Sequence, residues 1–91
     1  MLKIRDEVDL KELEKFGFNN KYNNVSNYEK VIDYGITIWV ENNHYIGIEN
    51  SMSYFYGNDI VKPYVQDLIQ AGIVEEVKIN EFWKTKRYIQ V

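Results

Sequence analysis

The chain contains no cysteine and only one histidine and one proline, and these low counts exclude several kinds of chemistry. Without cysteine, the fold cannot depend on disulfides, and neither a thiolate metal site nor a thiol nucleophile can form. The 5 glycines stand singly, so the sequence has no glycine-rich phosphate loop. The formal net charge of −3 gives no global attraction to nucleic acid or to an anionic membrane.

Groups that could perform catalysis are few. His44 is the single imidazole, and it falls in a predicted hairpin turn with Glu41 and Glu49 as neighbours. As a base it would need a nucleophile or a substrate proton within hydrogen-bond reach, and nothing fixes the geometry of the nearby Ser51 and Ser53. We therefore expect a protein that is not an enzyme, with no catalytic or metal-ligating residues and no cofactor.

Long apolar runs are also missing. No stretch approaches the roughly 18 apolar residues of a membrane span, and residues 1–7 turn acidic without the apolar core of a secretory signal. A length of 91 residues fits one domain, near the low end of what can bury its own core. We expect a single cytoplasmic domain over residues 1–91 with no membrane partner.

The sequence is instead rich in rings, with 8 tyrosines, 2 tryptophans and 4 phenylalanines. A domain of this size buries only about 60% of its unfolded surface, so some rings must stay partly exposed, and contiguous exposed rings mark binding sites. The competing interpretation is that Tyr54 and Tyr56 merely cover the core while their hydroxyls remain in contact with water. The expected partner-binding surface consists of Trp39, Tyr45, Tyr54, Phe55 and Tyr56.

A first helix is predicted over residues 8–18. Asp9 followed by Glu12 has the spacing of a capping box. Gly17 is the expected left-handed residue that ends the helix, with Phe18 folding back onto its last turn.

A second helix is predicted from apolar residues spaced i, i+3, i+4, i+7 and i+8, which form one amphipathic stripe. The stripe consists of Val61, Tyr64, Val65, Leu68 and Ile69. Two starts are open for this helix: Asp59 caps it and Pro63 costs one internal hydrogen bond, or the regular helix begins at Pro63 as its first residue. Gly72 is predicted to end the helix, with Ile73 over Leu68.

Between the helices, after an asparagine-rich loop, the hydrophobic period changes to two over residues 31–40 and again over residues 45–50, which predicts a β-hairpin. A three-residue turn pairs Val40 with Ile46 and keeps the isoleucines on one face, whereas a two-residue turn would send Ile46 to the other face. A histidine such as His44 is tolerated in the left-handed position of such a turn.

The same register sets Trp39 opposite Gly47, where the indole can cover the bare backbone. Alternation returns over residues 73–79, and residues 86–91 are expected to pair back as a second hairpin. The predicted fold is α+β: a single small domain of helix, antiparallel β-hairpin, helix and C-terminal β-hairpin.

The C-terminal stretch offers a second candidate surface, because three positive charges alternate with two rings, a composition that holds phosphates and stacks bases. Its residues are Trp83, Lys84, Lys86, Arg87 and Tyr88. The helix through Leu68, the run Ala71-Gly72-Ile73-Val74 and the end Arg87-Tyr88-Ile89 together resemble the recognition helix and wing of winged-helix DNA-binding domains. This resemblance implies nucleic-acid binding as the alternative function. The segment before it departs from that family, since it predicts a hairpin instead of two helices.

The segment Arg5-Asp6-Glu7-Val8-Asp9-Leu10-Lys11-Glu12-Leu13-Glu14-Lys15-Phe16-Gly17-Phe18 resembles the opening of small uncharacterised proteins encoded by phages and prophages of low-GC Gram-positive bacteria. The run Asp67-Leu68-Ile69-Gln70-Ala71-Gly72-Ile73-Val74 is similar to the same proteins. The resemblance implies an intracellular accessory role and transfers no functional residues. We expect a non-catalytic protein-binding module or phage-type accessory protein, whose partner is another protein or a second copy in a homodimer.

Overall fold

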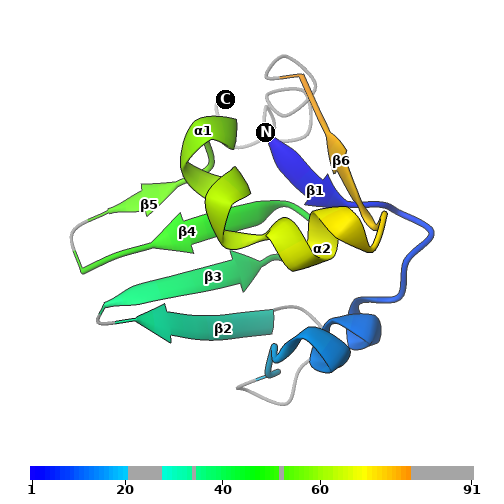
Figure 1. Cartoon of the computed structure of the whole chain (residues 1–91), viewed down its shortest axis with the longest axis horizontal. Coiled ribbons are helices and arrows are strands. Elements are labelled where there is room, and N and C mark those ends of the chain that lie inside the picture. The colour runs from blue at the N-terminus through cyan, green and yellow to red at the C-terminus, as the bar shows by residue number, and fades with distance from the viewer. Residues whose placement is uncertain (21–27, 34, 52, 79–91) are drawn as a thin grey trace, which may run out of the picture.

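Two antiparallel sheets and several short helices make up the described part of this computed structural model, which is residues 1–20, 28–33, 35–51 and 53–78 (Figure 1). The larger sheet is a meander of β2 (Tyr28–Asp33), β3 (Ile36–Val40), β4 (Ile46–Glu49) and β5 (Tyr54–Phe55). The smaller sheet pairs β1 (Leu2–Ile4) with β6 (Val74–Glu76). The helices are η1 (Leu10–Phe16), α1 (Asn58–Val61), η2 (Lys62–Tyr64) and α2 (Gln66–Gln70).

The turn between β3 and β4 confirms the predicted hairpin register. Val40 pairs with Ile46, and the backbone N–H of Glu41 donates to the carbonyl of Tyr45 at 3.0 Å, which leaves three residues in the turn. His44 takes the left-handed position with φ of 76°. A three-residue turn of this kind ends in a left-handed residue, and the N–H of His44 donates to the Glu41 carbonyl at 2.8 Å.

The two sheets adjoin at the beginning of β4. Lys3 forms an antiparallel bridge with Tyr45, and the N–H of Ile4 donates to the His44 carbonyl at 2.8 Å. β5 pairs with the other end of β4, so β1 and β5 lie along the same hydrogen-bonding edge of that strand. The smaller sheet therefore continues the larger one, and both present the same two faces.

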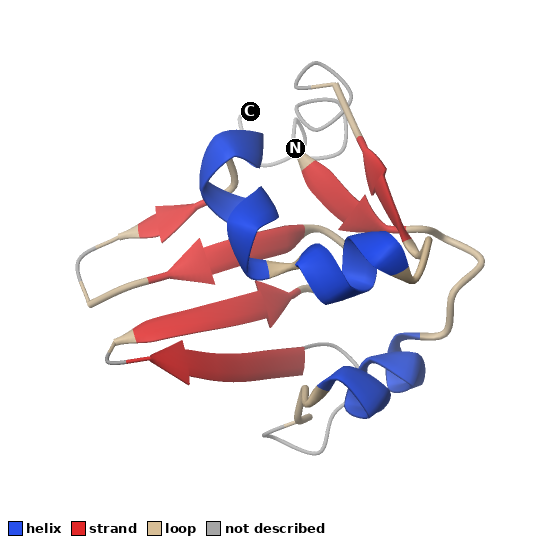
Figure 2. Cartoon of the chain, in the orientation of Figure 1, coloured by secondary structure: helices blue, strands red, loops and turns tan. Residues whose placement is uncertain are grey.

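One face of the meander is covered by α1, η2 and α2, which lie in front of the strands in Figures 1 and 2. Val61, Val65 and Leu68 are fully buried there. η1 lies beside the start of β2, where Asn19 bridges Glu29. The other buried members of the core cluster are Leu2, Ile4, Leu10, Leu13, Phe18, Tyr28, Ile38, Val40, Ile46 and Ile48. Strands and helices thus share one core on this side of the sheet.

The structure overturns the predicted order of helix, hairpin, helix and hairpin. Residues 2–4, for which no element was predicted, form a strand, and they take the place beside residues 74–76 that was predicted for residues 86–91. Residues 28–30, predicted as loop, belong to β2. The predicted C-terminal hairpin beyond residue 78 lies outside the described residues. The pairing of β1 with β6 joins distant segments of the chain, and hydrophobic period alone does not specify such a pairing.

The second predicted helix is divided into three short pieces. Val65 has φ of −125° and ψ of 30°, which is not helical and separates η2 from α2. Pro63 cannot donate a backbone hydrogen bond, so the turn around it is a 3-10 helix. The predicted end is confirmed, because Gly72 has φ of 76° and the N–H of Ile73 reaches the carbonyl of Leu68 at 3.4 Å.

The first predicted helix begins and ends where expected, but it is a 3-10 helix. The Asp9 carboxylate accepts from the N–H of Lys11 at 3.0 Å, and Gly17 is left-handed with φ of 89°. Glu12 does not complete the capping box. Its carboxylate instead accepts from Lys15 at 2.6 Å. Within the described part of the chain, none of the helices combines the length and apolar character needed to cross a bilayer.

Candidate functional site

The second face of the meander carries the rings that the sequence singled out. Trp39 pairs with Gly47 and Tyr54 pairs with Glu49. These positions alternate with the buried isoleucines along β3 and β4, so their side chains lie on the side away from the helices. Tyr56 lies next to Tyr54, with ring centroids 5.0 Å apart. We call the side chains of Trp39, Glu41, Glu49, Tyr54 and Tyr56, around Gly47, the aromatic face.

Tyr54 lies directly over Gly47. A Cβ atom at position 47 would come within 2.2 Å of Cε1 of the Tyr54 ring, so the ring occupies space that any other residue would fill. The predicted pairing of Trp39 with Gly47 is confirmed, but the ring that covers the glycine comes from β5. Tyr54 remains 38% exposed, and burial of the rest of the ring raises the pKa of its hydroxyl well above the ordinary value.

Two ring donors hold two carboxylates on this face. The indole Nε1 of Trp39 donates to the carboxylate of Glu49, and the hydroxyl of Tyr56 donates to Oε2 of Glu41 at 2.6 Å. Burial first, and then the hydrogen bond to Glu41, raise the pKa of Tyr56, since both favour the neutral phenol. These bonds fix the orientation of the rings.

The five predicted surface residues do not all lie together. Trp39, Tyr54 and Tyr56 belong to the aromatic face, and Tyr54 is the one among them that is classed as exposed. Tyr45 points to the same side but is only 3% exposed, with the ammonium of Lys3 5.5 Å from its ring centroid. Phe55 pairs with Ile48 on the core side, so it is not part of the aromatic face.

The carboxylates of this face are not among the predicted binding residues. In the sequence, Glu41 and Glu49 stand out only as neighbours of His44. Their relation to Trp39 was visible in the sequence, because Glu41 lies two residues beyond it on the same strand face and Glu49 belongs to the paired strand. The face is thus acidic as well as aromatic.

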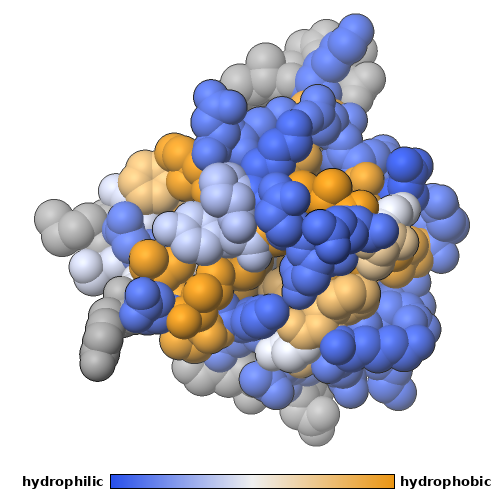
Figure 3. All heavy atoms as spheres, viewed as in Figure 1, coloured by the Kyte–Doolittle hydropathy of each residue, from blue (hydrophilic) through white to orange (hydrophobic). Residues whose placement is uncertain are grey.

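The sign of charge differs between the two faces of the meander. Glu29 pairs with Trp39 and adds a third carboxylate to the side of the aromatic face. Lys30, the next residue, faces the helices, where its ammonium lies 3.5 Å from the Asp67 carboxylate and 5.7 Å from the ring centroid of Phe18. Figure 3 shows that opposite, helix-bearing side, on which hydrophilic and hydrophobic surface alternate.

His44 shows no arrangement for catalysis among the described residues. Its Nδ1 is buried and has no hydrogen-bond partner within the part of the chain that the structure covers. The described ranges also contain no group of three or more histidine, cysteine, aspartate or glutamate residues placed to hold a metal ion. The hypothesis that the protein is not an enzyme stays a prediction.

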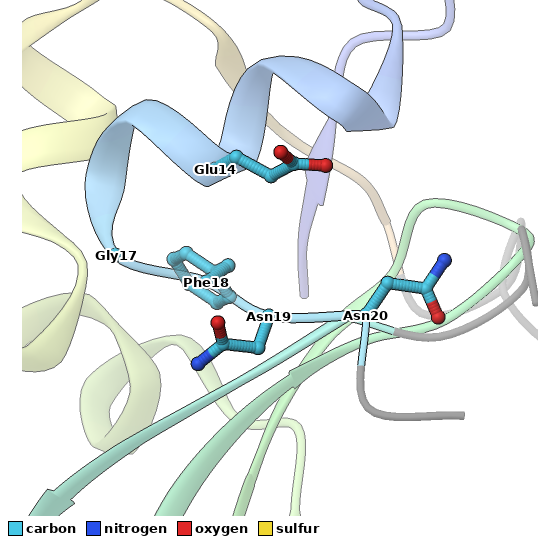
Figure 4. A pocket seen from close by; sticks show the side chains of 5 residues that line it. All are labelled: Glu14, Gly17, Phe18, Asn19 and Asn20. Atoms are coloured by element: carbon cyan, nitrogen blue, oxygen red, sulfur yellow. The ribbon is translucent and has the colours of Figure 1, made fainter. Parts of the chain in front are cut away.

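A hollow of about 450 Å³ lies at the end of η1. Figure 4 shows it lined by Glu14, Gly17, Phe18, Asn19 and Asn20. Its lining is mainly polar, and none of the predicted binding residues contributes to it.

The alternative nucleic-acid-binding residues Trp83, Lys84, Lys86, Arg87 and Tyr88 lie outside the described residues. The helix that would read bases in that hypothesis is α2, which has 5 residues. Lys62, a candidate base-reading residue of the predicted recognition helix, belongs to η2 instead, and its ammonium lies 3.0 Å from the Glu76 carboxylate. No described contact therefore supports the winged-helix resemblance.

Comparison with known proteins leaves the family open, because the chain matches no family model, no curated protein and no solved structure.

Proposed function

We propose that this chain is a non-catalytic protein-binding module, and that its partner lies against the aromatic face. The observation that carries the proposal is the placement of Tyr54 over Gly47, beside Tyr56 and in the same face as Trp39. Tyrosine and tryptophan rings that are held in place before binding lose little entropy on association, and they are the residues that dominate binding energy at interfaces.

The proposal includes the intracellular, phage-type accessory role that the sequence resemblance implies. A chain of 91 residues without cysteine suits a reducing compartment, where disulfides do not form. A second copy of the chain is one possible partner under this hypothesis, and nucleic-acid binding by the basic C-terminal residues remains the alternative. A gel shift at low salt tests the alternative, since phosphate contacts give affinity that falls steeply with salt.

The test of the proposed function compares two tyrosines of equal exposure. Tyr54 is 38% exposed on the aromatic face, and Tyr64 is 37% exposed on the helix side. Tyr54→Ala should lower capture of partner protein from an extract of the native host by about tenfold or more, the effect of losing a central interface ring. Tyr64→Ala should leave capture unchanged. Captured protein is quantified by mass spectrometry.

Circular dichroism serves as the check that both variants remain folded. If Tyr54→Ala captures as much protein as the wild type, or if both substitutions reduce capture equally, the aromatic face is not the binding surface.

A further inference from the structure

We propose that the aromatic face receives a cationic segment of the partner, with arginine or lysine side chains lying over the rings and beside the carboxylates of Glu41 and Glu49. This inference rests on the proposed function and adds the chemistry of the partner to it. It is carried by three observations: the sign of the charge on this face, the exposed ring between the two carboxylates, and contacts of the same kind elsewhere in the molecule.

The charge on this side of the meander is of one sign in the described residues. Glu29, Glu41 and Glu49 project from it, whereas Lys30 projects from the opposite side. Lys3 of β1 lies on the same side, where its ammonium is 5.5 Å from the Tyr45 ring centroid and already 2.8 Å from the carboxylate of Asp6. The potential over the rings is therefore negative, which favours a cationic partner.

The carboxylates keep capacity for a further ligand. Trp39 and Tyr56 each donate one hydrogen bond, to Glu49 and Glu41 respectively. An ionised carboxylate has about four lone-pair positions on its two oxygens, so one donor does not exhaust it. A guanidinium can bond such a carboxylate and stack on an adjacent ring at the same time. Tyr54 supplies that ring, since it lies in register with Glu49 and is 38% exposed.

Contacts of this kind already occur twice among the described residues. The ammonium of Lys3 lies 5.5 Å from the ring centroid of Tyr45, and that of Lys30 lies 5.7 Å from the ring centroid of Phe18. Each of these ammonium groups also pairs with an aspartate, at 2.8 Å for Lys3 and 3.5 Å for Lys30. A ring beside a carboxylate is thus one of the arrangements that hold cations among the described residues.

The same charges disfavour the other occupants. Two copies joined through this face would bring their Glu41 and Glu49 side chains together, and like charges across an interface are unfavourable. Nucleic acid would be repelled, because its phosphates carry the same sign as the face. A cationic polypeptide is the occupant that this surface attracts.

The experiment uses the full chain with Trp83→Phe, so that Trp39 is the only tryptophan that reports binding. The probe is a synthetic peptide in which arginine and threonine alternate, and its counterpart has glutamate in place of arginine. The arginine peptide should change the Trp39 fluorescence saturably, with an affinity that falls as salt is raised. The glutamate peptide should produce no change.

Two double variants with the same net charge separate a specific site from general attraction. Glu41→Gln with Glu49→Gln keeps acceptors for Tyr56 and Trp39 but removes the charges, and it should weaken arginine-peptide binding by about fivefold, which is in the middle of the range for the loss of two exposed ion pairs. Glu12→Gln with Glu76→Gln removes two carboxylates that pair with Lys15 and Lys62 elsewhere. That control should bind as the wild type does. Equal weakening by both double variants, or binding of the glutamate peptide, would overturn the inference.

The partner-capture assay distinguishes failure of this inference from failure of the proposed function. If capture depends on Tyr54 but not on Glu41 and Glu49, the aromatic face binds a protein that is not cationic, and only the inference is wrong. If neither Tyr54→Ala nor the Glu41 and Glu49 substitutions affect capture, both the proposed function and this inference are wrong. A dimer in sedimentation that disappears in Tyr54→Ala would identify a second copy as the occupant and would also overturn the inference.

Discussion

At the scale of single residues, the candidate site depends on the missing side chain at position 47. A glycine inside a strand normally weakens it, because the chain loses more entropy on folding and gains no packing. Here the space is filled by the Tyr54 ring, which lies where a Cβ would be. The glycine is therefore what allows the Tyr54 ring of β5 to lie over β4 and next to Tyr56.

Gly47→Ala should lower the free energy of unfolding by about 1–3 kcal/mol, the usual cost of an added methyl group in a filled space. The added carbon would meet Cε1 of Tyr54 at 2.2 Å and Cζ at 2.9 Å, so the ring must move. Urea unfolding followed by circular dichroism measures the change.

The control is the same substitution in a Tyr54→Ala background. Without the ring, Gly47→Ala should be neutral or stabilising, because alanine restricts the unfolded chain more than glycine does. If Gly47→Ala lowers the free energy of unfolding equally in both backgrounds, the position of the Tyr54 ring does not depend on the glycine.

At the scale of elements, the β3–β4 turn shows how much local sequence can specify. The isoleucines must share a face, and this requirement alone selects a three-residue turn over a two-residue one. The turn then needs one left-handed residue, which is His44 with φ of 76°. The helices behave differently. Val65 and Pro63 interrupt a stripe that has helical spacing, because packing onto the sheet and the lost proline donor outweigh the periodic pattern.

His44→Gly should raise the free energy of unfolding by about 0.5–1 kcal/mol. The left-handed conformation costs a non-glycine residue about 1–2 kcal/mol, and glycine removes this cost. Part of the resulting stabilisation is offset because glycine also increases the conformational entropy of the unfolded chain. The substitution also removes the Nδ1 atom, which is buried without a partner among the described residues. Thermal or urea unfolding measures the difference.

The companion variant His44→Val should be destabilising, because a β-branched residue is strongly disfavoured at positive φ. A stability order with valine above glycine would contradict the assignment of a strained left-handed turn.

At the scale of the whole molecule, the two sheets share one core. Ile4 of β1 is 0% exposed and belongs to the same buried cluster as Leu13 of η1 and Leu68 of α2. The N-terminal amino group donates to the carbonyl of Val77 at 3.0 Å, so a hydrogen bond joins the first residue to the residue that follows β6. We therefore expect the described domain to unfold as a single unit.

Ile4→Ala should cost about 2–5 kcal/mol, as for other fully buried isoleucines. It should also shift the whole unfolding transition, with circular dichroism and tryptophan fluorescence changing at the same urea concentration. Val31→Ala is the control, because Val31 is 69% exposed and such substitutions usually change stability by less than about 0.5 kcal/mol. Separate transitions in the two signals would show that β1 and β6 unfold independently of the meander.

The sequence by itself determined the features that depend on neighbouring residues: the left-handed ends at Gly17 and Gly72, the cap at Asp9 and the pairing of Val40 with Ile46. Backbone hydrogen bonds and side-chain alternation among residues a few positions apart in the sequence are sufficient to specify each of these features.

Only the tertiary structure decided that Leu2 pairs with Glu76 and that Tyr54, rather than Trp39, lies over Gly47. Only it separated Phe55 from the rings on the other face. These outcomes depend on which distant strands pair. The free energy of that pairing comes from burial in the shared core, a property of the assembled molecule that no local run of residues contains.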